Sequence, residues 1–367
     1  MKFLWTLTIV YAKKIGMPFV ILYFACCSNP LINIACEDAA GLEYVANQVL
    51  APYQYFFNGK IAKQRINKDD LFYEFEDRFS YHDSFYLKTT ASLISLLPSY
   101  TVGSLLKNIA LLSKASSKRY KNVLSSLNSK KIYSNNQSFS AYNVNFPGKD
   151  STEMLIGQNH PRRPGDEKNL HAEKECLKQI ITILNKHNII NWVDCGTLLG
   201  TYRHGGVIPW DDDLDLAVFS KDFDNVLRAL NDLDKGKYQV LDWSPRGYPK
   251  TLLKVYVKES DGLVDLYQYN IIPENDQIAV NFAFEEHLFY PEWWRKRERR
   301  YAAPHPISSI FPLKKANFDG IEVFVPNDTV KYLQVFYGKN IDPAMVYDKN
   351  TCQYEKVLDH PYWSFGH

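Results

Sequence analysis

Several features are scarce in this sequence, and each scarcity excludes a class of protein. Glycine and proline number only 17 and 18 among 367 residues, which excludes a collagen-like or wholly disordered chain. The formal net charge is only +2, so no nucleic-acid partner bound through bulk charge is expected. None of the six cysteines forms a C-x-x-C pair, so a zinc ribbon and a thioredoxin-type motif are both absent from the sequence.

The length and the local composition predict several regions rather than one. A chain of 367 residues has room for two to three domains of roughly 150 residues each. Residues 134–166 are rich in Asn, Ser, Pro and Gly, which break regular structure and indicate a linker. We therefore expect five regions: a hydrophobic membrane-associated or signal-like segment at 1–36, an accessory helical region at 37–133, the linker at 134–166, the principal domain at 167–340 and a C-terminal tail at 341–367.

The first third of the chain contains two stretches that suit contact with a membrane. Residues 15–36 carry no charge and follow Lys13 and Lys14, a pattern that fits a spanning segment, a signal sequence or a buried helix. Residues 91–112 are weakly polar and precede a run of Lys and Arg without any acidic residue. This second pattern fits an interfacial, lipid-facing helix and equally a surface helix before a solvated linker.

The second half alternates between helical and strand patterns and so predicts an α/β domain. Apolar residues recur at helical spacing before His187, and residues 214–218 alternate apolar and acidic side chains as a two-faced strand does. The expected elements in chain order are a helix ending near 187–188, a strand at 191–195, a short helix at 198–203, a strand within 207–218, a helix at 222–233, strands at 252–257 and 263–268, a hairpin turn at 318–321 and a helix from 327 to 338.

A dense acidic cluster is the strongest chemical signal in the sequence. Asp211, Asp212, Asp213 and Asp215 repel one another unless a cation or water lies between them. Because strand side chains alternate, Asp213 and Asp215 share one face about 6–7 Å apart, close enough to chelate a hard divalent cation. Asp265, in an apolar–acidic–apolar strand, is predicted to join them. The cofactor we expect is Mg²⁺ or Mn²⁺.

The acidic cluster has two other interpretations. An Asp-rich turn is commonly a solvated loop without a metal. A calcium-binding EF-hand loop is the rival ligand scheme, but Leu216 occupies the position where that loop requires glycine. Asp222 rather than glutamate stands at the twelfth position, which also argues against calcium. The order of strand, Gly–Thr turn, helix and two acidic strands favours a catalytic metal site.

The stretch from Asp194 to Leu216, DCGTLLGTYRHGGVIPWDDDLDL, resembles the signature of the LicD family, which includes fukutin and fukutin-related protein. The resemblance extends over about 170–338, including Val264-Asp265-Leu266 and the later FDGIEVFVPN at 318–327. It implies a nucleotidyltransferase-like fold, a mixed sheet flanked by helices. Residues 1–150 resemble no family that we can name.

Carried over residue by residue, the resemblance implies that Asp213 and Asp215 form the metal-binding catalytic pair and that Asp265 is the third acidic ligand. Five further positions are candidates for binding the donor's phosphates: Gly196, Thr197, Arg203, His204 and Lys254. The alternative role for Arg203 and His204 is to cap and pack the end of the short helix.

The resemblance implies an enzyme, a CDP-alcohol-dependent phosphotransferase. It would move a phosphoalcohol, of the phosphocholine or ribitol-phosphate type, from a CDP-linked donor to a glycan acceptor in glycoprotein or cell-surface polysaccharide modification. The alternatives are a nucleotidyltransferase that releases pyrophosphate and a non-catalytic, membrane-tethered scaffold of the same fold. A membrane-associated protein is expected, in the Golgi lumen of a eukaryote or on the cytoplasmic face of a bacterial inner membrane.

Overall fold

The computed structural model describes residues 29–34, 39–58, 60–67, 70–77, 84–133, 153–244, 250–260, 262–272, 275–281 and 300–364, with positions 22, 25 and 26. The chain divides into two units, Met1–Ile132 with Asp242–Pro249 and Ala283–Arg295, and Tyr133–Leu241 with Lys250–Phe282 and Lys296–His367. Much of the first predicted membrane stretch, residues 15–36, lies outside the described residues. Among the helices that are described, none combines the length and the apolar content needed to cross a bilayer.

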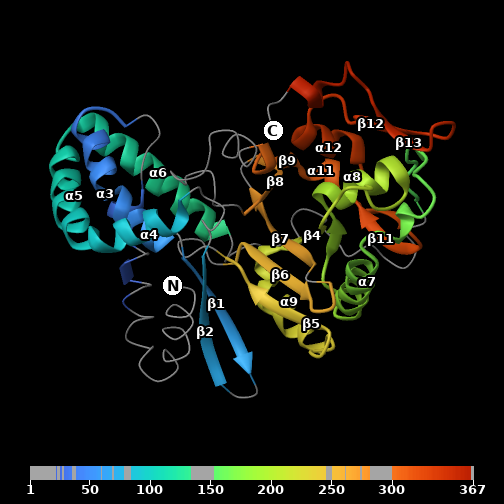
Figure 1. Ribbon diagram of the computed structural model, residues 1–367, viewed down its shortest axis with the longest axis horizontal. Coiled ribbons are helices and arrows are strands. Elements are labelled where there is room, and N and C mark those ends of the chain that lie inside the picture. The colour runs from blue at the N-terminus through green and yellow to red at the C-terminus, as the bar shows by residue number, and fades with distance from the viewer. Residues whose placement is uncertain are drawn as a thin grey trace. The chain divides into compact units, whose positions relative to one another are not determined.

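The described residues of the first unit form helices and one β-hairpin (Figure 1). Its elements are α2 (Pro30–Asn33), α3 (Leu42–Asn58), β1 (Lys60–Asn67), β2 (Asp70–Asp77), α4 (Phe85–Ile94), α5 (Leu96–Ala110) and α6 (Lys114–Tyr133). α3 packs along α5, because Gly103 lets the two backbones approach; a Cβ there would lie 2.6 Å from Leu50 Cγ. The weakly polar stretch 91–112 thus spans the end of α4 and all of α5.

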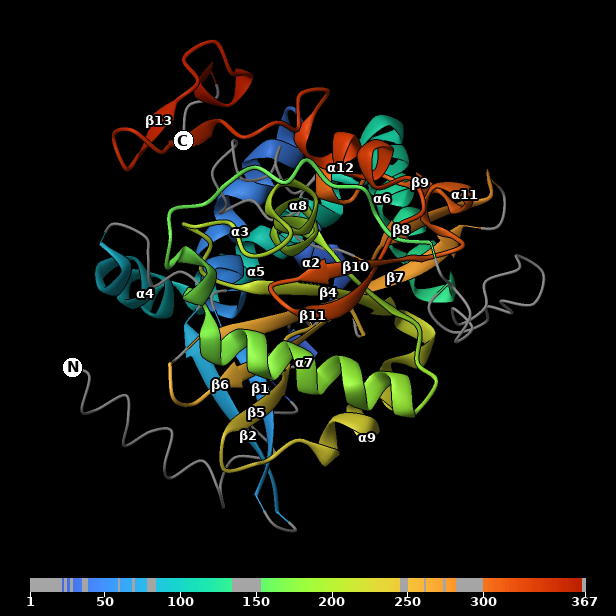
Figure 2. The same ribbon diagram turned by 90° about the vertical axis from the view of Figure 1, so that its right-hand side faces the viewer.

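The second unit is a mixed sheet flanked by helices, as the sequence predicts (Figure 2). Its helices are α7 (His171–Lys186), α8 (Cys195–His204), α9 (Phe223–Ala229), α11 (Ile307–Ile310) and α12 (Thr329–Tyr337). The main sheet contains β3 (Asn191–Val193), β4 (Leu214–Phe219), β5 (Tyr238–Asp242), β6 (Leu252–Val257), β7 (Leu263–Ile272), β8 (Gln277–Val280) and β9 (His305–Pro306). Two hairpins complete the unit, β10 (Lys314–Phe318) with β11 (Ile321–Val325) and β12 (Met345–Asp348) with β13 (Gln353–Lys356).

The register of the sheet decides where the acidic residues meet. The strand order is β3-β4-β7-β6-β5, with β4 parallel to β7 and β6 antiparallel to it. Asp215 on β4 stands opposite Asp265 on β7, which in turn stands opposite Lys254 on β6. Because residues in register across neighbouring strands project from the same face, these three side chains form one row across the sheet.

α7 covers the sheet through the apolar stripe that its sequence predicts. It packs against β3, β4, β6 and β7, with Leu177, Ile180 and Leu184 fully buried (Figure 2). The Trp192 ring of β3 makes edge-to-face contacts with the rings of Phe219 on β4 and of Phe311. These aromatic contacts fill the core beside β3 and β4. The sheet that carries the acidic row is therefore held rigidly by a conventional core.

Several predicted boundaries differ from the structure for local reasons. The strand expected within 207–218 begins only at Leu214, because residues 209–210 form a turn after Pro209. The helix expected from Leu198 begins at Cys195, so the Gly–Thr pair forms its first turn rather than a preceding loop. The strand expected to reach Cys195 ends at Val193 because Asp194 caps that helix. The region expected as a tail contains the β12–β13 hairpin.

Candidate active site

The acidic site is built where β4 begins, beside the start of α8. Asp213 lies one residue before β4, and Asp215 and Asp265 lie on β4 and β7. Carboxylate oxygens from these three residues all lie within 4.8 Å of one another. Asp215 and Asp265 are 4% and 3% exposed, so their charges are held largely out of water. The three aspartates predicted as the metal site are therefore brought together.

Like charges at such short range raise the proton affinity of the carboxylates. Burial, followed by repulsion from Asp213 and Asp265, raises the pKa of Asp215 well above its ordinary value. Burial also raises the pKa of Asp265, against the lowering influence of Lys254. The pKa of Asp211 rises to about 7 through burial and its acidic neighbours Asp213 and Asp212. A cation bound among these groups would remove this repulsion.

The residues present fit a hard divalent cation. The donors are carboxylate oxygens alone, the ligand type that Mg²⁺ and Mn²⁺ prefer. Asp265 Oδ1 and Asp211 Oδ2 are buried without a hydrogen-bond partner, an arrangement that normally costs free energy and that coordination would satisfy. Asp211, Asp212 and Asp213 also converge within 4.8 Å, so a second cluster adjoins the first through the shared Asp213.

The predicted phosphate-binding residues Gly196 and Thr197 hold the acidic strand in place. The Gly196 amide donates to Asp215 Oδ2 at 3.1 Å, and the Asp215 amide donates to Thr197 Oγ1 at 2.7 Å. The first turn of α8 is thus joined to the start of β4 by two hydrogen bonds. Since the Gly196 amide already binds Asp215, it acts on the acidic site itself; a role at a donor phosphate stays a prediction.

Gly196 is also a position where an added side chain would displace part of the acidic site. A Cβ at this position would lie 2.7 Å from Asp211 Oδ2. We expect Gly196→Ala to lower turnover about tenfold to a hundredfold, because small displacements of reacting groups have effects of that size. Alanine has a higher helix propensity than glycine, which offsets part of the cost of the contact, so the variant should stay folded. Steady-state rates and the melting temperature of the variant check both parts.

Gly236→Ala is the matched control for this substitution. A Cβ at exposed Gly236 would also meet an aspartate carboxylate, Asp234 Oδ1 at 3.0 Å, but in a turn after α9 away from the acidic site. Its activity should equal that of the unmodified chain. Equal activities of the two variants would contradict the importance of the Gly196–Asp211 contact.

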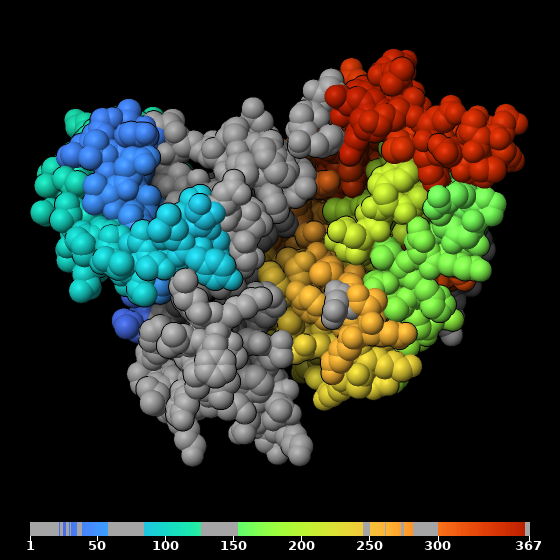
Figure 3. Space-filling model, viewed as in Figure 1, coloured from blue at the N-terminus to red at the C-terminus, as the bar shows by residue number. Residues whose placement is uncertain are grey.

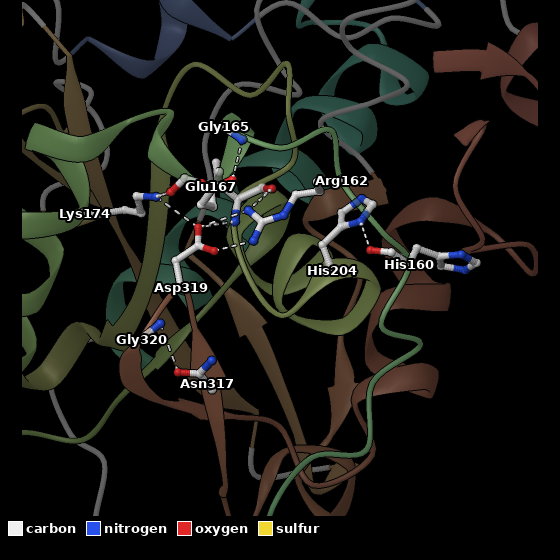
Figure 4. A network of polar contacts seen from close by, with 10 residues as sticks. His160, Arg162, Gly165, Glu167, Lys174, His204, Asn317, Asp319 and Gly320 are labelled. Atoms are coloured by element: carbon white, nitrogen blue, oxygen red, sulfur yellow. Dashed lines mark hydrogen bonds and ion pairs between the residues drawn. The ribbon is translucent and has the colours of Figure 1, made fainter. Parts of the chain in front are cut away.

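Lys254 lies within the site, whereas Arg203 and His204 turn away to bind the chain's own backbone. Lys254 Nζ donates to Asp265 Oδ2 at 2.8 Å. Arg203, which is buried, donates to the carbonyls of Ile341 and Asp342. His204 Nδ1 contacts the carbonyl of His160 at 3.0 Å (Figure 4), and burial lowers the pKa of His204 to about 4. For these two residues the geometry is that of the packing role.

Two residues that position the site were not among the predicted ones. Asp194, fully buried, caps α8: Oδ1 accepts from the Cys195 amide and Tyr332 hydroxyl, each at 2.8 Å, and Oδ2 accepts from Tyr269 at 2.5 Å. The sequence contains a signal for this role of Asp194, because an aspartate directly before the start of a helix is a common N-cap. The turn residue Asp319 is the other, and only its hairpin was predicted.

Asp319 fastens the loop between α8 and β4 to two other parts of the unit. Its carboxylate accepts from the Val207 amide at 3.0 Å, from Lys174 at 3.0 Å and from Arg162 at 2.5 Å. Figure 4 shows the Lys174 and Arg162 side chains converging on it. A Cβ on Gly206 would overlap the same carboxylate, so glycine is required where the loop passes Asp319. This loop leads directly to the acidic cluster.

The mixed sheet thus brings three aspartates together beside the start of a helix whose first turn is joined to one of them. Residues 188–328 match the sequence model of the family described as LicD/FKTN/FKRP, nucleotidyltransferase domain. The resemblance to the LicD family is therefore confirmed, over a range that includes all three aspartates.

Curated relatives agree with the family match. An uncharacterised protein of Rickettsia prowazekii is 28% identical over 180 residues, 48% of this chain and 58% of that protein. The human ribitol 5-phosphate transferase FKRP is 27% identical over 180 residues, and the human ribitol-5-phosphate transferase FKTN is 27% identical over 170 residues. These matches cover 47% and 46% of this chain, and 32% of each transferase. The chain thus spans less than two thirds of the length of each relative.

Proposed function

We propose that this chain is a metal-dependent phosphotransferase that moves a phosphoalcohol from a CDP-linked donor to a hydroxyl of a glycan. The observation that carries the proposal is the convergence of Asp213, Asp215 and Asp265 within 4.8 Å, in a domain of LicD type. Two relatives named as ribitol 5-phosphate transferases support a phosphoalcohol as the transferred group. Phosphocholine and ribitol phosphate are the two types that we propose.

The three aspartates would hold Mg²⁺ or Mn²⁺. When bound, such an ion supplies positive charge that neutralises the phosphate oxygens during transfer. The chain's own contribution is to fix the carboxylates: Gly196 and Thr197 hold Asp215, and Lys254 holds Asp265 at 2.8 Å. Rigid placement of this kind is where most of the catalytic power of phosphoryl transfer lies.

Asp265 is also our candidate for the group that takes the proton from the acceptor hydroxyl. Its Oδ2 binds Lys254, while its buried Oδ1 has no hydrogen-bond partner. Lys254 and a bound cation would both favour the charged form of Asp265, which is the form that can accept a proton. In the reaction the acceptor oxygen forms a bond to the phosphorus that bears the alcohol, the bond to CMP breaks, and CMP leaves.

Product analysis tests the proposal directly. The purified chain is incubated with CDP-ribitol or CDP-choline, Mg²⁺ and a glycan acceptor, and the nucleotide products are separated. We expect CMP to accumulate only when donor, acceptor and metal are all present. Release of pyrophosphate from a nucleoside triphosphate would instead indicate nucleotidyl transfer. If the chain turns over neither donor, and calorimetry detects no metal-dependent binding of nucleotide, the chain is a scaffold.

A further inference from the structure

Helix α5 has an inverted pattern of burial. Its large apolar residues face outward: the side chains of Leu97 and Leu105 are 74% and 62% exposed. Its small and charged residues face inward, since Ser99, Gly103 and Lys107 are buried. A helix of a water-soluble domain normally shows the reverse arrangement.

The inward face of α5 makes hydrogen bonds and packing contacts with the rest of the unit. These contacts prevent α5 from rotating to bury its leucines. Ser99 Oγ donates to the Val49 carbonyl at 2.6 Å, and Gly103 lies against Leu50. Lys107 Nζ donates to Asn47 Oδ1 at 2.6 Å and to the Ile34 carbonyl at 3.1 Å, with no exposed side-chain surface. These contacts fix the outward direction of the apolar face.

The exposed residues form one continuous strip, which we call the apolar strip. From Leu97 to Ile109 they recur every four residues, the spacing of one helix face, with one residue before α5 and one after it. Ile94 and Leu112, at the two ends, are 78% and 83% exposed. The members of the strip are Ile94, Leu97, Thr101, Leu105, Ile109 and Leu112. Figure 3 shows α4 and α5, in cyan and teal, at the surface of the first unit.

The charge of the segment that carries the strip favours one kind of partner. Residues 84–133 contain eight Lys and Arg and no Asp or Glu. Lys88, Lys114, Lys118 and Lys121 are exposed. Two copies of this chain pairing through the strip would bring like charges together, whereas an anionic lipid surface attracts them. At 15 residues, α5 spans about 22 Å, shorter than a hydrocarbon core of about 30 Å, so it would lie in the plane of the membrane rather than cross it.

We propose that the apolar strip inserts into the headgroup–acyl boundary of an anionic bilayer, with the exposed lysines of α4 and α6 against the lipid phosphates. This proposal does not depend on the proposed reaction. It concerns residues 88–121, which lie outside the range 188–328 that the family model matches.

Hydrogen exchange measured by mass spectrometry on the full chain tests the proposal locally. Vesicles of phosphatidylcholine mixed with phosphatidylglycerol should slow exchange in peptides covering 94–112, and vesicles of phosphatidylcholine alone should slow it much less. Peptides from α7 serve as an internal reference and should not change. Unchanged exchange at 94–112 with anionic vesicles would overturn the proposal, as would slowing that follows protein concentration without lipid, which indicates a second copy.

Substitutions separate the apolar and the charge contributions. Leu97→Gln combined with Leu105→Gln should weaken anionic-vesicle binding by about tenfold or more, because each leucine loses its burial in lipid. Changing Lys114, Lys118 and Lys121 to Gln should weaken binding about fivefold per charge. Ile156→Gln with Leu358→Gln is the matched control, since these side chains are 90% and 85% exposed in the second unit. Equal loss in this control would contradict a specific role for the strip.

Discussion

Asp215→Asn is expected to lower the proposed phosphoalcohol transfer by a factor of about a thousand or more, while the second unit stays folded. Asp215 is one of three carboxylates converging within 4.8 Å, and its removal takes away a full negative charge from the proposed metal site. Loss of metal-ion stabilisation of the transferring phosphate amounts to several kcal/mol, and about 4 kcal/mol corresponds to a thousandfold in rate. CMP release under saturating donor measures the effect.

Folding is expected to survive because asparagine keeps an acceptor oxygen for the Gly196 amide and relieves repulsion from Asp213 and Asp265. Asp359→Asn, which removes one exposed charge in the C-terminal segment, is the matched control and should leave the rate unchanged. Calorimetry gives a second readout: Mg²⁺ with a CDP-linked donor should bind the unmodified chain and bind Asp215→Asn far more weakly. Undiminished transfer by Asp215→Asn would mean that the acidic cluster is not the catalytic site.

The acidic row could be predicted because it depends on short-range rules. Period-two alternation places Asp265 between two buried apolar residues, and a parallel pairing of two acidic strands then sets Asp215 beside Asp265. Lys254 was predicted only as a phosphate-binding candidate, and its position opposite Asp265 comes from the antiparallel pairing of β6 with β7. These predictions required only local patterns and one assumption about which strands are neighbours.

Residues whose role depends on distant partners could not be predicted. Arg203 lies in the family signature, yet it binds carbonyls more than 130 residues later, at Ile341 and Asp342. Asp319 sits in a turn that looks like any Asp–Gly hairpin, and its partners Arg162 and Lys174 precede it by 157 and 145 residues. No local pattern encodes such pairings; they follow from how β10–β11 packs on the rest of the unit.

Asp319→Asn is expected to destabilise the second unit by about 3 kcal/mol at neutral pH, the largest effect on stability that we predict. Removal of one partner from a buried ion pair leaves its counterpart uncompensated. Here two cations would be left, Arg162 and Lys174, whose side chains are only 12% and 8% exposed. Urea unfolding followed by tryptophan fluorescence measures the change, because Trp192 is buried in the sheet of this unit.

The pH dependence identifies the ion pairs as the cause. Burial by itself would raise the pKa of Asp319, but hydrogen bonds from Arg162, the Val207 amide and Lys174 outweigh it and lower that pKa. A lowered carboxyl pKa contributes stability above the unfolded value, about 3.9, and the contribution disappears as the pH falls through the folded value. The stability difference between the unmodified chain and Asp319→Asn should therefore be largest at neutral pH and shrink below about pH 4.

Asp224→Asn is the matched control: Asp224 pairs with Lys250 at 2.6 Å but is 65% exposed, so its loss should cost less than about 1 kcal/mol. A difference for Asp319→Asn that stays constant down to low pH would show that shape, not charge, is what Asp319 contributes to the loop.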